Sequence, residues 1–197
     1  MMHLVDTIQP AANFEAFLRD RDGKVVPESV RKAHNVFTTT GKNWLSKLSA
    51  WSTIGSLDEP YTNRRVRWMG VGTGVQAEVT SVTALANPAL YAGSDFLAPI
   101  SSVSFPTSTS VRFIRTYGLT EITIWGAVVL TEAGLFADVN PYDFVTGGEG
   151  SEDTLAPSGT SVLDPTIGSN PPVAYKSFDP ITKTQDFTLE IRWDLRY

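Results

Sequence analysis

The sequence contains no cysteine and only two histidines, His3 and His34, among its 197 residues. Without cysteine there can be no disulfide, no thiolate metal site and no cysteine nucleophile. A serine–histidine–aspartate triad would have to use one of the two histidines. Neither the G-x-S-x-G nucleophile elbow nor the H-E-x-x-H metal motif occurs. We therefore expect no catalytic residues, no metal site and no bound cofactor.

Basic charge and long apolar runs are also scarce. The formal net charge is -5, whereas nucleic-acid binders usually present a basic face. The one dense basic cluster, Arg64, Arg65 and Arg67, is interpreted as a solvated strand edge or a subunit contact. No apolar run approaches the roughly 18 residues of a membrane span, and residues 1–18 lack the pattern of a secretory signal. We expect synthesis in the cytoplasm and no partnership with nucleic acid or membrane.

The residues that are present suit a packed β-rich domain. Hydrophobic residues make up 42% of the chain and charged residues 19%, so a core can form. Short runs of β-branched and aromatic residues lie between turn formers and predict strands. These runs cover 65–71, 103–105, 111–117, 121–130 and 134–137. Their number and spacing are typical of a sandwich or a barrel.

The clearest strand signal lies in residues 187–195. The apolar residues of this segment alternate with Thr188, Glu190, Arg192, Asp194 and Arg196; they are Phe187, Leu189, Ile191, Trp193 and Leu195. A period of two places the two sets on opposite faces of a strand. Burial of the five apolar side chains contributes on the order of 10 kcal/mol before entropy is subtracted. We therefore predict a strand paired inside a sheet.

A helix is predicted near residues 40–50. Thr40 is a candidate N-cap, because its hydroxyl can accept a free backbone amide. Trp44, Leu45, Leu48 and Trp51 follow at helical spacing, which predicts one face packed against the core.

Residues 1–26 are interpreted as an N-terminal arm. Phe14, Phe17 and Leu18 fit the apolar face of a short helix within this arm, and residues 20–24 are predicted to form a turn.

The predicted organisation is thus the arm 1–26 followed by a domain of residues 27–197. The fold class is mainly β, an antiparallel β-sandwich of jelly-roll-like or immunoglobulin-like type with one or two short N-terminal helices. A loop insertion near 146–172, rich in glycine and proline, is expected to be exposed and to order against a partner.

Several segments partly match known ligand-binding or catalytic motifs. The run 70–74, GVGTG, lacks the G-K-[ST] ending of a phosphate loop and is read as a glycine-permitted turn. The run 20–23, DRDG, lacks the later ligands of a calcium loop. Candidate acids near strands are Glu121, Glu132 and Glu190, but nothing singles out a hydrolytic pair. Trp68, Trp125 and Trp193 fall in predicted strands, where core packing is favoured over a carbohydrate-binding face.

Four segments, taken in order, resemble a group of small structural proteins of tailed-bacteriophage virions. They are TTGKNWLSKL at 39–48, MGVGTG at 69–74, LTEAGLF at 130–136, and FDPITKT at 178–184 followed by LEIRWDL at 189–195. The resemblance covers about residues 35 to 195 apart from the loop, and the group has no catalytic residues to carry over. Within it, Glu132 to Gly134 are expected to form a tight turn, and Pro180 to end an irregular segment.

The resemblance implies a structural virion protein, made in the host cytoplasm, and not an enzyme. It would assemble as a homo-oligomer in the tail, neck, collar or baseplate region through its arm and loops. Its partners would be other copies of itself and other phage virion proteins. The alternative is a carbohydrate- or receptor-binding β-sandwich module of a tail fibre, suggested by the aromatic content. A hydrolase with a carboxylate pair is a third possibility.

Overall fold

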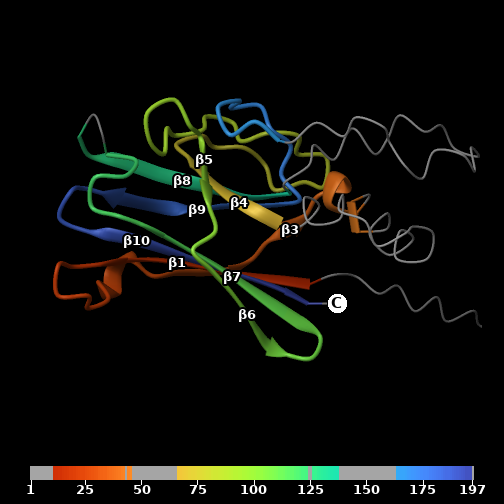
Figure 1. Ribbon diagram of the computed structural model, residues 1–197, viewed down its shortest axis with the longest axis horizontal. Helices are drawn as coiled ribbons and strands as arrows, with labels where there is room; N and C mark the ends of the chain where they lie inside the picture. Colours follow the sequence, from red (N-terminus) through yellow and green to blue (C-terminus); the bar gives the residue numbers. More distant parts are fainter. Residues whose placement is uncertain (1–10, 43, 46–65, 124–125, 138–162, 197) are drawn as a thin grey trace, which may run out of the picture.

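The chain forms two antiparallel β-sheets of five strands each in the computed structural model (Figure 1). The structure describes residues 11–42, 44–45, 66–123, 126–137 and 163–196. Within these residues no helix has the length and apolar character needed to cross a membrane. The prediction of a mainly β protein is confirmed.

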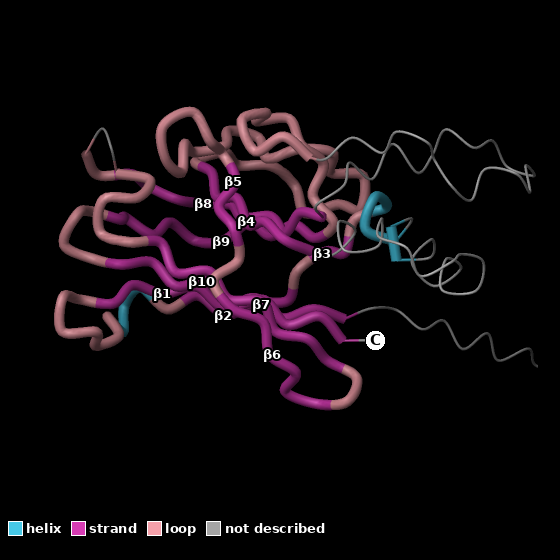
Figure 2. Tube along the Cα trace, viewed as in Figure 1, coloured by secondary structure: helices cyan, strands magenta, loops and turns pink. Residues whose placement is uncertain are grey.

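The first sheet brings together strands from both ends of the described chain. Its order is β2 (Arg31–His34), β1 (Ala11–Arg19), β10 (Thr188–Arg196), β7 (Ser110–Tyr117) and β6 (Ser102–Thr107). The second sheet follows the order β3 (Val36–Phe37), β9 (Ala174–Lys183), β8 (Val128–Ala137), β4 (Val66–Gly72) and β5 (Leu97–Pro99). Figure 2 shows the strands in two layers, with long connecting segments along the second sheet.

Strand β10 confirms the strongest sequence prediction. Leu189, Ile191, Trp193 and Leu195 are each 0% exposed. Trp193 lies opposite Phe14 of β1 on one side and Phe113 of β7 on the other. The alternation is therefore that of a central strand with one face in the core.

The two sheets share one hydrophobic core. It joins Phe14 and Trp193 of the first sheet to Leu130, Leu135 and Ile181 of the second. The ring of Phe14 meets that of Trp193 edge to face, with centroids 5.2 Å apart.

A second, smaller cluster buries the other face of the second sheet. Strand residues Phe136 and Tyr175 pack there with residues from the connecting segments, namely Val82, Leu85 and Leu163. The described part of the predicted loop insertion, residues 163–172, thus contributes a buried leucine to the core and is not wholly exposed. Residues 146–162 lie outside the described residues.

The interpretation of residues 11–19 as part of an arm with a helix is wrong. They form β1, which pairs with β10 along its whole length. Phe14, Ala16 and Leu18 are buried on the core side, whereas Phe17 belongs to the opposite face. The following turn also returns to β1, because the amide of Val26 donates to the carbonyl of Leu18. Residues 1–10 lie outside the described residues.

Helical structure near the predicted position is confirmed for residues 39–42 and 44–45. Its cap is Thr38 and not Thr40, because the amide of Gly41 donates to the Thr38 hydroxyl oxygen at 2.9 Å. That hydroxyl donates in turn to the carbonyl of Pro172 at 2.7 Å, which fixes the helix start to the second sheet. Trp44 is buried as expected. Leu48 and Trp51 lie outside the described residues.

Two further local expectations are corrected. Glu132 to Gly134 lie in the middle of β8 and make no turn, since Leu130 and Leu135 on either side are both buried in the core. Pro180 lies inside β9 and does not end an irregular segment. Proline is tolerated there because β9 bulges against β8 between Ser177 and Ile181, so Pro180 has no partner in the β8–β9 register.

Candidate functional site

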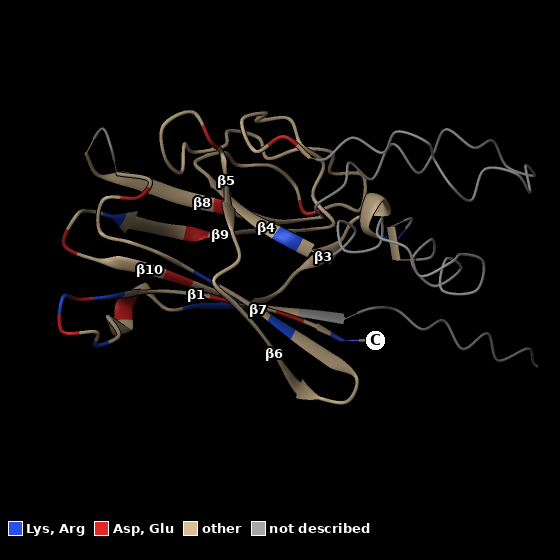
Figure 3. Ribbon diagram, viewed as in Figure 1, with Lys and Arg blue, Asp and Glu red and all other residues tan. Residues whose placement is uncertain are grey.

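The outer face of the first sheet carries a band of charged side chains. Because the odd-numbered residues of β10 face the core, Glu190, Arg192 and Asp194 face outward. The register sets Asp194 opposite Arg112, and Arg192 opposite Glu15. Basic and acidic residues therefore lie side by side on β1, β7 and β10 (Figure 3).

Arg19, Lys32, Arg112 and Arg192 of this band each have a carboxylate partner. Arg112 grips Asp194 with two hydrogen bonds, at 2.6 and 2.8 Å, which raise the pKa of Arg112 further above its ordinary value. Lys32 lies 2.9 Å from Glu15, and Arg192 lies 3.5 Å from the same carboxylate. These four basic side chains are thus neutralised within the band.

Glu190 extends the band along the sheet. Its carboxylate accepts from Arg19 at 2.9 Å and from Arg192 at 2.8 Å. Burial acts to raise the pKa of Glu190, but these two hydrogen bonds outweigh it and the net shift is downward. The guanidinium groups of Arg19 and Arg192 both lie 4.9 Å from the ring centre of Phe17. They cover Phe17, which is only 3% exposed although it belongs to the outer face.

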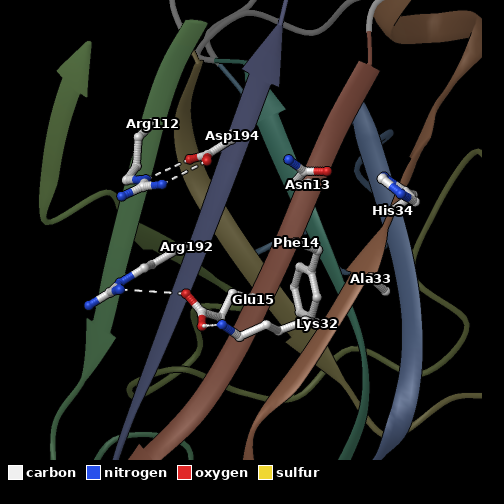
Figure 4. Close-up of a pocket in the computed structure, with 9 residues that line it drawn as sticks. All are labelled: Asn13, Phe14, Glu15, Lys32, Ala33, His34, Arg112, Arg192 and Asp194. Carbon is white, nitrogen blue, oxygen red and sulfur yellow. Dashed lines mark hydrogen bonds and ion pairs between the residues drawn. The ribbon is translucent and has the colours of Figure 1, made fainter. Parts of the chain in front are cut away.

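A hollow of about 400 Å³ opens on this face (Figure 4). Its lining is Asn13, Phe14, Glu15, Lys32, Ala33, His34, Arg112, Arg192 and Asp194. The polar groups not held in ion pairs, Asn13 and His34, lie at one end. The charged residues of this lining already pair with one another, which disfavours a charged small molecule as its ligand.

The glycine run 70–74 has a structural role. The Glu132 carboxylate accepts backbone amides from Gly74 at 3.1 Å, Asn87 at 2.8 Å and Ala86 at 3.0 Å, and the Tyr175 hydroxyl at 3.1 Å. A Cβ atom at Gly74 would lie 2.5 Å from a Glu132 oxygen and 2.5 Å from the Ala86 side chain. Within the run, the amide of Gly74 thus binds the protein's own carboxylate, and the amide of Thr73 donates to the carbonyl of Asn87.

A third polar cluster lies between the sheets. Arg115 binds Glu121 at 2.7 Å and is flanked by the rings of Tyr91 and Tyr117. Nearby, the fully buried Lys183 donates to the carbonyl of Leu119 at 3.2 Å. Burial lowers the pKa of Lys183 to about 8. Burial likewise raises the pKa of Tyr117 well above its ordinary value.

The three acids proposed from sequence are not brought together as a pair. Glu121 binds Arg115, Glu132 holds the segment of residues 73–87, and Glu190 binds Arg19 and Arg192 on the outer face of the first sheet. Across the described part of the chain, no three His, Cys, Asp or Glu side chains gather as a metal site.

The remaining candidates are placed as follows. His34 lies on the edge strand β2, and the run 20–23 is a turn in which Asp20 accepts the amides of Asp22 and Lys24. Trp193 is in the core, and Trp68 is half-buried in β4. The guanidinium of Arg67, which is exposed on β4, lies over the Trp68 ring. His3, Arg64, Arg65 and Trp125 lie outside the described residues.

Sequence reasoning missed the partners in the charged band. It assigned Arg192 and Asp194 to the polar face of their strand, but Glu15, Lys32 and Arg112 carried no sign of joining them. The signal was available in β1, where Glu15 and Arg19 flank Phe17 with a period of two.

Comparisons of the chain with protein-family models, with curated proteins and with solved structures find no match.

Proposed function

We propose that the chain is a structural protein of a tailed-bacteriophage virion. It assembles as a homo-oligomer in the tail, neck, collar or baseplate region, and its partners are other copies and other virion proteins. It is made in the host cytoplasm, acts without catalysis, and binds neither nucleic acid nor membrane.

The observation that carries this proposal is the contact between Glu132 and Gly74. It joins two of the four segments on which the resemblance rests, and β4 and β8 pair directly at Gly72 and Glu132. A third segment forms the centre of the first sheet, and the fourth starts the helix held by Thr38. The shared residues thus define the scaffold itself, which is what a group of proteins related by fold and assembly would have in common.

Within this proposal the two sheets form a sandwich of jelly-roll-like type. The support is a series of nested pairs, in which early strands pair with late ones. Strand β1 pairs with β10, β3 with β9, and β4 with β8.

A carbohydrate-binding module is not favoured by a specific observation. Trp193 is fully buried and cannot stack on a sugar. The hydrolase alternative loses support as well, because Glu121, Glu132 and Glu190 each bind a different set of protein groups.

The test is the protein's presence in particles produced from the genome that encodes it. Purified particles, analysed by mass spectrometry and by antibody labelling under the electron microscope, should contain the chain in multiple copies at one position. If the chain is abundant in the infected lysate but absent from purified particles, the proposed function is wrong.

A further inference from the structure

The two edges of the first sheet differ in character. Edge strand β2 carries the charged residues Arg31 and Lys32, and charges of this kind protect an edge against pairing with other strands. Edge strand β6 carries no charge, and the uncharged run extends over residues 100–111. All six residues of β6 are exposed.

Strand β6 also exposes large apolar side chains. Val103 is 48% exposed and Phe105 is 78% exposed. Val103 lies opposite Phe113, a core residue, so its side chain is on the core-facing side of the sheet. The β6–β7 hairpin projects beyond the second sheet, and among the described strands only β7 pairs with β6 (Figure 1). An apolar, unpaired edge of this kind is a template for another strand.

We propose that β6 pairs antiparallel with β6 of a second copy across a twofold axis, joining the two first sheets into one continuous sheet. With Ser104 on the axis, Val103 of each copy lies opposite Phe105 of the other. The two residues are two apart in one strand and so share a face. The register shift after Ser104, together with Pro106, which has no amide hydrogen, limits the pairing to a short run.

Charge selects a second copy as the occupant. In an isologous contact each residue of a strand lies near residues of the same strand in the other copy. Because β6 is uncharged, two copies of β6 can pair without placing like charges opposite each other. Pairing of β6 with β2 of a neighbour would set Arg31 and Lys32 against a strand that has no acid to match them. Pairing of β2 with itself would oppose basic residues.

This inference rests on the proposed assembly role, because so short a contact buries far less than the roughly 1,000 Å² of a stable isolated interface. The association is therefore weak between free subunits and becomes effective when subunits are held close together, as in a particle.

The absence of cysteine gives a direct test with the full-length chain. Ser104→Cys should form a disulfide-linked dimer under mild oxidation, since residue 104 faces its own copy across the axis. His34→Cys, an exposed position on the opposite edge of the same sheet, is the matched control and should stay monomeric. Equal cross-linking of the two variants, or none at Ser104, overturns the proposal.

A second pair of variants tests the apolar contact. Phe105→Asp, added to Ser104→Cys, should slow dimer formation about tenfold or more, because a charge then faces Val103 of the other copy. Phe105→Leu should retain the rate. An unchanged rate with aspartate overturns the proposal. If the chain cross-links but is absent from particles, the virion role is wrong and the β6 contact stands. If the chain is present in particles but does not cross-link, the β6 contact is wrong and the virion role stands.

Discussion

Replacing Glu132 by glutamine is expected to loosen the segment of residues 73–87 from the second sheet. The carboxylate is fully buried and accepts from four donors: the amides of Gly74, Ala86 and Asn87 and the hydroxyl of Tyr175. Glutamine keeps one acceptor oxygen and presents two N–H groups in place of the other.

The magnitude follows from the partners of each oxygen. The glutamine oxygen can still accept from Gly74 and Asn87, and the Tyr175 hydroxyl can reverse and accept from the new amide. The backbone amide of Ala86 can only donate, so it is left facing the N–H groups of the glutamine side chain without an acceptor. One unpaired buried donor together with the loss of charge-assisted bonding costs about 3–4 kcal/mol of the free energy of unfolding. That is a large part of the 5–15 kcal/mol or so that is typical of a domain.

The assay is urea unfolding followed by tryptophan fluorescence, for which the buried Trp44 and Trp193 are internal probes. Amide hydrogen exchange locates the change. Exchange should accelerate at Gly74, Ala86 and Asn87, while the amides of β10 keep their protection relative to global unfolding.

Tyr175→Phe is the graded control, since it removes only the hydroxyl that bonds Glu132 and should cost about 1 kcal/mol. If Glu132→Gln is no more destabilising than Tyr175→Phe, the carboxylate does not organise the segment and our reasoning fails.

Four further predictions concern other parts of the fold. Lys183→Met should raise the free energy of unfolding at pH 7 by up to roughly 3 kcal/mol, because a pKa of about 8 against 10.5 for a free lysine means that burial of the charge is costly. In the wild type the folded state binds fewer protons at Lys183 than the unfolded state, so stability should rise between about pH 8 and 10. At higher pH stability should fall, because burial raises the pKa values of Tyr117 and Tyr175 and opposes their ionisation in the folded state. Urea titration of both proteins at pH 7 checks the first effect and titration of the wild type above pH 8 checks the second, which a flat profile contradicts. Gly74→Ala should cost at least about 2 kcal/mol in the same titration, because its methyl group has no space beside Ala86 and Glu132, and a neutral result would mean that the segment yields easily. Arg112→Ala, at a half-exposed ion pair, should cost only about 1 kcal/mol and leave the protein folded by circular dichroism.

The sequence predicted the β class, the helix near residue 40 and β10 because these depend on local periodicity. It failed at β1, where Phe14, Phe17 and Leu18 fit helical spacing while the buried partner between them, Ala16, is too small to be noticed. It failed at β9, where Pro180 suggested a break, but the bulge of β9 against β8 accommodates the proline.

The charged band was beyond local reasoning altogether. The ion pair of Arg192 with Glu15 joins residues 177 positions apart, and that of Arg112 with Asp194 joins residues 82 apart. Such contacts depend on the register of the sheet, which one strand alone does not determine. The role of Glu132 was missed for the same reason, since its donors come from a segment about 45 to 58 residues away.

The position of β10 also bears on how the subunit matures on the ribosome. It follows every other described strand in the chain, yet it lies at the centre of the first sheet between β1 and β7. The first sheet therefore cannot form completely until β10 has been synthesised. Until then, the edges of β1 and β7 that pair with β10 remain unpaired. A fragment that stops before residue 188 lacks Trp193 and the other core residues of this strand. Such a fragment has no way to form the first sheet, so translation that ends early yields no competent subunit.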